Sequence, residues 1–231
     1  MKNLKKKILV VVAHPDDESF GMGGTLARYA REGAEIHVLC ATHGESGKGK
    51  GNLGKIRERE LHKASQILGV TQVDCLNYVD GTLCNNLYHE VAEKVEAKIK
   101  SFGPHIVLTF DQRGLSGHID HVFMSLVATY VCRKYKRQLK LFYLCDLKSY
   151  TRLLFNYFIY FPPGYEEKEV DVVIDTSKDW VTRVQAMKAH KSQMHDVRRI
   201  LLLKRIFPKK EYFLAAFPKR NKQQVNDLFD Y

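Results

Sequence analysis

The chain has 231 residues, 45% of them hydrophobic, and a formal net charge of +11. This length supports a sizeable core in one or two domains, and we expect one. The five cysteines are scattered and form no CxxC pair, which favours reduced core thiols over disulfides or a thiolate metal site. The chain has no run of the ~20 apolar residues that a membrane-spanning helix needs, and the apolar run after residues 2–7 is too short for a signal peptide. These features predict a cytoplasmic protein.

Short β-branched runs alternate along the chain with longer segments of helical periodicity. Most of the runs are nearly continuously apolar, as expected for strands covered on both faces. The predicted strands are residues 8–13, 35–41, 73–78, 106–110, 139–144 and 170–175. The predicted helices are residues 22–32, 53–68, 88–102 and 118–135.

This alternation predicts an α/β fold, namely a Rossmann-like three-layer fold with a mainly parallel sheet. We find no repeat and no linker that would divide the chain, so residues 1–231 are expected to form a single domain. Its core covers about residues 7–195, and the segment after Leu147 is expected to be an irregular C-terminal extension. Residues 196–231 form a basic C-terminal segment.

The segment AHPDDESFG, residues 13–21, directly follows the first predicted strand. In open α/β sheets the ligand crevice lies outside the carboxyl ends of the strands. We therefore expect four side chains of this segment to line the crevice: His14, Asp16, Asp17 and Glu18. A carboxylate cluster at this place repels phosphate and attracts a metal cation. The glycines that follow come too late and with the wrong spacing for a dinucleotide-binding loop, which argues against NAD or FAD.

A second cluster, GHIDH at residues 117–121, holds the same place after the predicted strand at residues 106–110. His118 and His121 are spaced i, i+3 and face the same side if a helix starts there. The two clusters can then meet across one cleft. Histidines outside these motifs, such as His37 or His62, are expected to have no chemical role.

Three of four side chains in these motifs can bind one ion: His14, Asp17, His118 and His121. Zinc accepts histidine nitrogen and carboxylate oxygen and, in catalytic sites, keeps a position for water. A site of two histidines and one carboxylate also suits iron(II). Asp16 then remains as a general base, and the remaining histidine can stabilise an oxyanion or protonate a leaving amine.

The two motifs resemble the paired signatures of the PIG-L/LmbE-like zinc N-deacetylases, which remove acetyl from N-acetylglucosamine units of glycosides or glycolipids. The resemblance covers roughly the first 195 residues. It includes further elements of the sequence: residues 42–45 (THGE), Arg57, Glu60, Ala64, residues 68–69 (LG), residues 80–81 (DG) and residues 190–193 (HKSQ). It implies a metal-dependent N-deacetylase with zinc as the cofactor.

By this resemblance, His14, Asp17 and His121 would bind the zinc ion. Asp16 would be the catalytic base, and His118 would be the acid or oxyanion group.

Three further residues receive roles from the same resemblance. Asp120 would orient a neighbouring imidazole, and Arg57 and Asp80 would hold the sugar hydroxyls. Without the resemblance, an arginine within RERE would indicate a salt-bridged helix face, and Asp80 followed by glycine a turn.

The chain departs from the family pattern at two positions. His43 stands where the family often has aspartate, and Ser116 stands two residues before His118, where one branch has a tyrosine that helps with the oxyanion. These departures leave the rate and the substrate open.

The sequence thus predicts a zinc-dependent hydrolase that removes acetyl from an N-acetylglucosaminyl glycoside or glycolipid. The alternatives are a metallohydrolase of another amide, or a non-catalytic basic module that binds anionic lipid or nucleic acid. No nucleic-acid-binding motif accompanies the charge, so nucleic acid is the less favoured partner. The resemblance also implies assembly as a homo-oligomer, a trimer or hexamer.

Positive charge is concentrated near the C-terminus, where residues 197–222 carry nine Lys or Arg and one acidic residue. Apolar residues interleave with these cations, as in a segment that lies on an anionic membrane surface. Together with the aromatic residues between 150 and 165, this pattern raises peripheral membrane association and a lipid-linked substrate as a hypothesis. An edge helix with its cations in water is the alternative.

Overall fold

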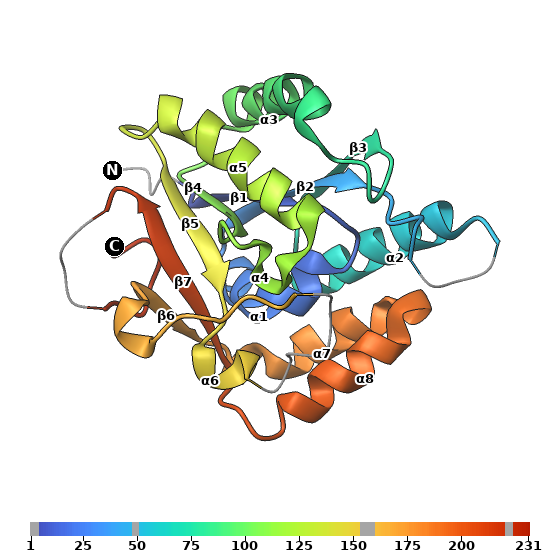
Figure 1. Cartoon of the computed structure of the whole chain (residues 1–231). Coiled ribbons are helices and arrows are strands. Elements are labelled where there is room, and N and C mark those ends of the chain that lie inside the picture. Colours follow the sequence, from blue (N-terminus) through green and yellow to red (C-terminus); the bar gives the residue numbers. More distant parts are fainter. Residues whose placement is uncertain (1–4, 48–50, 153–159, 220–223) are drawn as a thin grey trace.

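A seven-stranded sheet runs through the protein in the order β3-β2-β1-β4-β5-β7-β6 (Figure 1). The computed structural model describes residues 5–47, 51–152, 160–219 and 224–231. The strands are β1 Lys7–Val12, β2 Glu35–Thr42, β3 Gln72–Tyr78, β4 Ile106–Phe110, β5 Lys140–Cys145, β6 Val172–Asp175 and β7 Lys210–Phe217. The first five strands pair in parallel, and β7 runs antiparallel to both β5 and β6.

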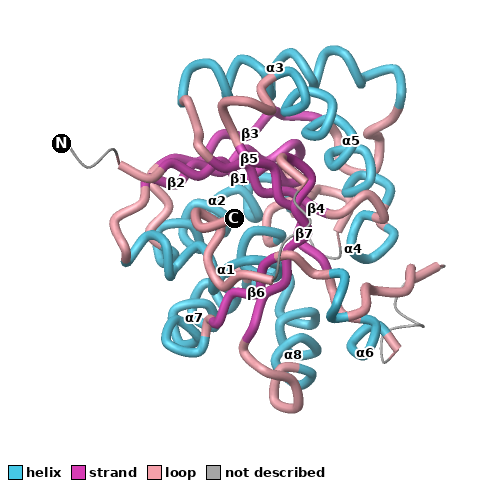
Figure 2. Tube along the Cα trace, turned by 90° about the vertical axis from the view of Figure 1, so that its left-hand side faces the viewer, coloured by secondary structure: helices cyan, strands magenta, loops and turns pink. Residues whose placement is uncertain are grey.

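Helices cover both faces of the sheet, which explains the continuous apolar runs of β1, β2, β4 and β5 (Figure 2). One face is covered by α3 and α5, and the other by α1, α2 and α7, with α8 beside α7. The α-helices are α1 Asp17–Arg31, α2 Leu53–Leu68, α3 Tyr88–Phe102, α4 Gly114–Gly117, α5 Ile119–Lys134, α6 Lys148–Thr151, α7 Trp180–Ala189 and α8 Met194–Leu203. The 3-10 helices are η1 Asn85–Leu87, η2 Glu167–Glu169, η3 Ser177–Asp179 and η4 Lys191–Gln193. The predicted three-layer α/β fold is confirmed.

Most element boundaries agree with the sequence pattern within two residues. The helices α2 and α3 have the predicted bounds, and each ends at a glycine in the left-handed region, Gly69 with φ 79° and Gly103 with φ 63°. A Cβ at Gly69 would lie 2.6 Å from the Cβ of Ala30, so glycine is needed there for packing as well. Helix α1 begins five residues earlier than predicted, at Asp17, because its first turn is made of the acidic motif itself.

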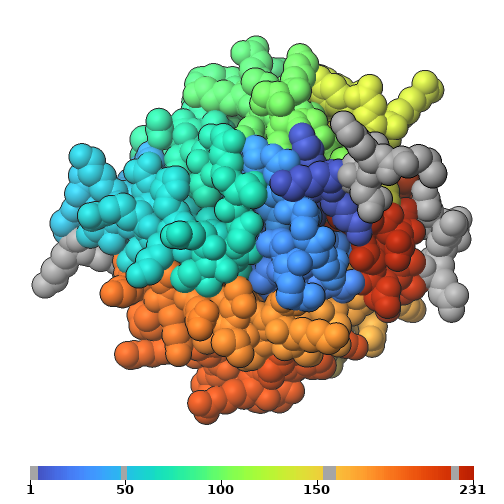
Figure 3. Space-filling view, turned by 180° about the vertical axis from the view of Figure 1, so that it is seen from behind, coloured from blue at the N-terminus to red at the C-terminus, as the bar shows by residue number. Residues whose placement is uncertain are grey.

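The C-terminal part is more regular than the sequence pattern suggests. Strand β7 lies in the basic segment 196–231 and inserts between β5 and β6. In the sequence, this strand begins with the charged residues Lys210 and Glu211, which obscure the apolar stretch that follows and pairs with β5. The space-filling view from behind shows residues of the C-terminal half, in orange, directly against those of the N-terminal half, in blue and cyan (Figure 3). Helix α7 contacts both α1 and α2.

Among the described residues, none of the helices combines the length and the apolar character needed to cross a bilayer. Much of the aromatic stretch between residues 150 and 165 falls at 153–159, outside the described residues.

Candidate active site

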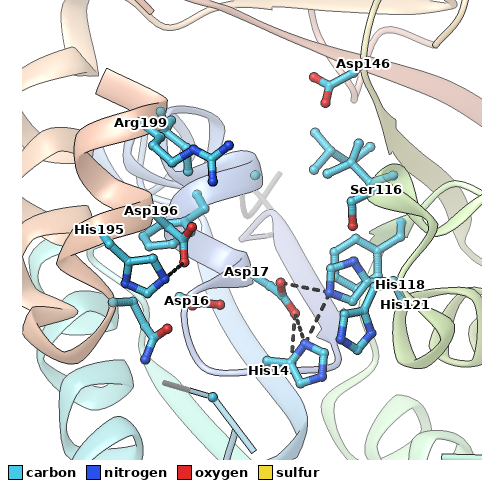
Figure 4. Close-up of a pocket in the computed structure, with 18 of the residues that line it drawn as sticks. His14, Asp16, Asp17, Ser116, His118, His121, Asp146, His195, Asp196 and Arg199 are labelled. Carbon is cyan, nitrogen blue, oxygen red and sulfur yellow. Dashed lines mark hydrogen bonds and ion pairs between the residues drawn. The ribbon is translucent and has the colours of Figure 1, made fainter. Parts of the chain in front are cut away.

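The two histidine motifs meet at one edge of the sheet because β1 and β4 are parallel neighbours. His14, Asp16 and Asp17 follow β1, whereas His118 and His121 stand at the start of α5, which follows β4. All five side chains line one cavity of about 640 Å³ (Figure 4). The structure therefore brings the two motifs together across one cleft, as the sequence predicts.

Three donor groups face a common point between the motifs. Nδ1 of His14 lies 3.2 Å from Nε2 of His121 and 3.7 Å from Oδ2 of Asp17. Nε2 of His121 lies 3.2 Å from Oδ1 of Asp17. Zinc bonds of about 2.0–2.2 Å in a tetrahedron separate their ligand atoms by about 3.3–3.6 Å. The observed spacings therefore suit three ligands of one tetrahedral cation.

Hydrogen bonds fix the orientation of both imidazoles. Nε2 of His14 lies 3.0 Å from Oδ1 of Asp80 and 3.1 Å from Oδ2 of Asp120. Nδ1 of His121 lies 3.1 Å from the carbonyl oxygen of Gly114. Because these oxygens accept hydrogen bonds, the outer nitrogen of each ring keeps its proton when a cation binds, and the inner nitrogen then offers its lone pair to the cation. The donor set thus fits a bound metal in its chemistry as well as in its spacing.

Two neighbours keep the Asp17 carboxylate charged. Burial disfavours the charged form, but the imidazoles of His121 and His14 hold the pKa of Asp17 well below its usual range. Its Oδ2 also accepts backbone N–H bonds from Ala13 at 3.2 Å and His14 at 2.8 Å. His118 adds a further nitrogen, since it forms with His14 and His121 a group whose ligand atoms lie within 4.8 Å of one another.

Asp16 is held in a strained backbone conformation next to the cation position. Its φ of 122° lies in the region that L-residues rarely adopt. Its carbonyl accepts the N–H of Ser19 and of Phe20, and its own N–H donates to Glu18 at 3.1 Å, so the following turn enforces this conformation. Burial raises the pKa of Asp16 to about 7, although the nearby positive charge of Arg57 opposes the rise. A carboxyl with a pKa in this range is suited to proton transfer near neutral pH.

Arg57 holds the Asp16 side chain and the loops on either side of it. Nη2 of Arg57 donates to Oδ2 of Asp16 at 2.9 Å and to the carbonyl oxygen of Pro15 at 2.7 Å, and Nη1 donates to the carbonyl oxygen of Gly44 at 2.7 Å. A Cβ at Gly44 would lie 2.5 Å from the guanidinium carbon. Glycine at this position therefore makes room for the arginine.

His118 is the N-cap residue of α5, and Asp120 donates its backbone N–H to Nδ1 of His118 at 3.2 Å. An accepting Nδ1 places the proton of the neutral ring on Nε2. Burial lowers the pKa of His118 to about 4, and the neighbouring imidazoles of His121 and His14 act in the same direction. A neutral His118 can therefore donate an N–H bond but holds no positive charge near neutral pH. The carboxylate of Asp120 pairs with His14, so the imidazole that it orients is that of His14.

Arg57 and Asp80, the residues expected to hold the sugar, both line the cavity. The side chains are nevertheless almost fully buried, with exposed fractions of 6% and 7%. Arg57 is bonded to Asp16, and Asp80 to His14 and to the backbone N–H of Ser46 at 3.1 Å. Whatever contact they make with substrate, both also position groups around the cation site.

Glu18 does not line the cavity, so the expectation that it faces the crevice is wrong. Its side chain is fully buried and pairs with His190 at 3.0 Å, because one step along α1 turns it away from Asp17 toward η4. Ser192 donates from its backbone N–H and its hydroxyl to Glu60, at 2.9 and 2.6 Å. The HKSQ segment therefore packs behind the acidic motif.

The far wall of the cavity is formed mainly by residues that follow β5. Asp146, directly after β5, and Arg199 of α8 lie on opposite sides of the cavity, and Ser116 is on the same side as Asp146 in this view (Figure 4). Apolar side chains complete this wall: Tyr150, Phe161, Ile200, Leu203 and Phe207. Helix α8 lies largely in the basic segment, where an edge helix is one of the two expectations, so the sequence indicates a helix there but not its place on the cavity wall.

Comparison with known protein families identifies the chain. A family model described as PIG-L, GlcNAc-PI de-N-acetylase, matches residues 9–132, a range that includes both histidine motifs. The chain belongs to the PIG-L family. The resemblance stated from the motifs is thus confirmed, and with it the expectation of an N-deacetylase family. This PIG-L family protein is also 29% identical over 239 residues to the 1D-myo-inositol 2-acetamido-2-deoxy-alpha-D-glucopyranoside deacetylase of Mycobacterium sp. strain KMS, covering 84% of the chain and 76% of the relative.

Solved structures share the fold of this PIG-L family protein at low identity. The N,N'-diacetylchitobiose deacetylase of Pyrococcus horikoshii aligns with a TM-score of 0.67 and 23% identity over 91% of the chain and 83% of that protein. GalB, the 4-carboxy-2-hydroxymuconate hydratase of Pseudomonas putida KT2440, aligns with a TM-score of 0.73 and 18% identity over 94% of the chain and 99% of that protein. The same fold therefore occurs in proteins named for different reactions.

Proposed function

We propose that this protein is a zinc-dependent hydrolase that removes the acetyl group from an N-acetylglucosaminyl glycoside or glycolipid. The observation that carries the proposal is the convergence of His14, Asp17 and His121 beside Asp16, in a cavity large enough for a sugar and part of its aglycone. The PIG-L family match and the deacetylase relative support the substrate class. The choice of zinc over iron(II) belongs to the proposal, because two histidines and one carboxylate suit both.

His14, Asp17 and His121 would hold the cation, which when bound would polarise the amide carbonyl and make the attacking water more acidic. Asp16 accepts a proton from that water, and the strained turn and the Arg57 bond fix the direction in which its carboxylate points. The same carboxyl can return the proton to the leaving amine.

His118 acts on the other side of the reacting amide. Its Nε2–H is directed by the Asp120 N–H bond to Nδ1 and can donate to the carbonyl oxygen as negative charge develops there. Asp80 and Asp120 keep the His14 ring in one orientation throughout. The products are acetate and the free amine.

Metal analysis and activity measured on the same samples test these roles. Asp16→Asn is expected to keep the metal and lose about 10²-fold or more in turnover of an N-acetylglucosaminide. Asp17→Ala and His121→Ala are expected to lose both metal and activity, and His118→Ala to keep metal and lose turnover. Loss of metal from Asp16→Asn would overturn the assignment of base and ligand.

Two alternatives give different results in the same experiment. A metallohydrolase of another amide would bind metal but leave N-acetylglucosaminides intact. A non-catalytic basic module would need no near-stoichiometric metal at all.

The far wall supports a substrate whose aglycone is partly apolar. Apolar side chains of α6 and α8 line the part of the cavity away from the proposed metal position. The basic side chains of Arg199 and Lys204 line the same part. Leu202 and Ile206, 61% and 73% exposed, lie next in sequence to this wall. A lipid-linked N-acetylglucosamine and an anionic membrane surface remain part of the proposal on this basis.

We also propose that residues 196–231 belong to the same domain as the rest of the chain. Strand β7 is hydrogen-bonded between β5 and β6, and Glu211 of β7 forms a buried ion pair with Arg183 of α7 at 2.8 Å. Deleting this segment is therefore expected to unfold the protein rather than release a tail.

A further inference from the structure

Three side chains of types that bind metals form a second group, which lies outside the cavity. His43 follows β2, Glu58 belongs to α2 and Cys75 belongs to β3. One ligand atom from each lies within 4.8 Å of the other two, and Nδ1 of His43 is 3.6 Å from Oε2 of Glu58. None of the three residues lines the cavity. The cysteine pattern gave no signal for this group, because its members come from three separate elements.

The His43 ring is oriented as a metal ligand would be. Its Nε2 lies 2.7 Å from Oδ1 of Asn77, an oxygen that accepts hydrogen bonds, so the ring proton sits on Nε2. Nδ1 of His43 is buried and has no hydrogen-bond partner among the described residues. Its lone pair therefore faces the Glu58 carboxylate at a distance too long for a hydrogen bond. A cation between the two groups would satisfy both.

Cys75 contributes a thiol that lies beside a second cysteine, Cys40. It stands directly opposite Cys40 in the register of β2 and β3, and the neighbouring Cys40 thiol holds the pKa of Cys75 below its usual range although burial opposes this. The thiolate is the form that binds metals. Cys40 itself stays neutral, since burial raises its pKa well above the ordinary value.

We propose that His43, Glu58 and Cys75 bind a zinc ion at a second site, separate from the cation site in the cavity. A set of nitrogen, sulfur and carboxylate ligands suits zinc, whereas Mg²⁺ and Ca²⁺ prefer oxygen alone. Three protein ligands leave a fourth position for water.

The sulfur ligand makes the second site visible by spectroscopy. The ligands proposed in the cavity are two imidazoles and a carboxylate, so only the second site can give a thiolate-to-cobalt charge-transfer band. The full-length protein, kept reduced, is titrated with Co²⁺ and in parallel dialysed against Zn²⁺ for metal counting. We expect each chain to bind two metal equivalents. The intensity of the near-ultraviolet charge-transfer band should grow as one of these two equivalents binds.

Matched variants locate the band. Cys75→Ser and His43→Gln are expected to keep one metal equivalent and to lose the band or weaken its binding at least tenfold. Cys84→Ser is the control, because Cys84 is exposed and lies outside the group; it should behave as the wild type. Circular dichroism establishes that each variant is folded.

Two outcomes would overturn the proposal: no band in the folded wild type, or a band that persists in Cys75→Ser. In the first case His43 and Glu58 form only an ion pair. A single metal equivalent that carries the band and is lost in Cys75→Ser supports the second site and counts against the cavity site. Deacetylase activity is not a readout here, so failure of this site and failure of the proposed reaction are distinguishable.

Discussion

Replacement of Arg57 by glutamine separates two roles that the sequence and the structure give to this residue. The family resemblance places Arg57 on the sugar hydroxyls, whereas in the structure its guanidinium is bonded to Asp16, Pro15 and Gly44. The variant leaves the Asp16 carboxylate buried without its cation. Removing one partner of a buried ion pair costs about 3–5 kcal/mol. In a domain of this size, about 1 kcal/mol shifts Tm by about 2–4 °C, so Tm should fall by about 6–20 °C.

The effect on catalysis follows from the charge of Arg57. The guanidinium lowers the pKa of Asp16 against the effect of burial, so its removal raises that pKa further and protonates more of the base near neutral pH. We expect kcat/KM to fall by about 10²-fold near neutral pH and the acidic limb of its pH profile to move to higher pH. Part of the activity should return at alkaline pH.

Two substrates and one control complete the test. The loss should be similar for an N-acetylglucosaminide and for a minimal acetamide, because Asp16 serves both. Arg59→Gln, on the exposed side of the same helix, should change neither Tm nor the profile by more than the error. An unmoved acidic limb with a loss confined to the glycoside would refute the positioning argument and favour sugar binding.

Three further predictions concern the surroundings of the site. Asp80→Asn removes a carboxylate 3.0 Å from Nε2 of His14, and metal affinity measured against a chelator should fall about 10–100-fold; an unchanged affinity with a raised KM would favour sugar binding instead. Burial lowers the pKa of His190, but the charge and hydrogen bond of Glu18, together with the charges of Asp16 and Glu60, raise it above its ordinary value. The pair therefore stabilises the fold fully below the ordinary histidine pKa of 6.5 and loses this contribution as pH rises through the raised value. His190→Gln should therefore be more destabilised in urea unfolding at about pH 6 than at about pH 9, and an equal loss at both would contradict the charged pair. Sedimentation with anionic vesicles should exceed that with neutral ones, fade with salt and be weakened by replacing the exposed Arg198 and Arg205 with glutamine; no preference in the intact protein would remove the membrane hypothesis.

The sheet could be predicted from the sequence because its inner strands are buried on both faces. Buried parallel strands such as β1 and β4 have no solvent side, so each forms an apolar run that is legible without knowledge of its neighbours. Strand β7 carries charged residues at its start, and its pairing with β5 depends on contacts between segments about 70 residues apart in the sequence. Such contacts leave no local pattern.

The same distinction applies to the candidate site. The position of His14, Asp16 and Asp17 in the cavity is predictable because residues directly after a strand of a parallel sheet lie where the ligand crevice forms. The contributions of Arg57 and Asp80 to positioning are not predictable, because an arginine in RERE or an aspartate before a glycine has common structural explanations. Only the buried bonds to Asp16 and His14 reveal them.

The fold itself does not choose the reaction. A named hydratase and a named deacetylase both share this sheet at identities below 25%, so the parallel strands provide a crevice and nothing more specific. The present chain adds side chains after β1 and at the start of α5, and each of them is fixed by a partner. Arg57 fixes Asp16, and Asp80 and Asp120 fix His14. The backbone N–H of Asp120 fixes His118. These partners set which atom of each ring carries a proton and where each carboxylate points. In the proposed reaction, they aim the Asp16 carboxylate at the attacking water and the His118 N–H at the oxygen of the reacting carbonyl.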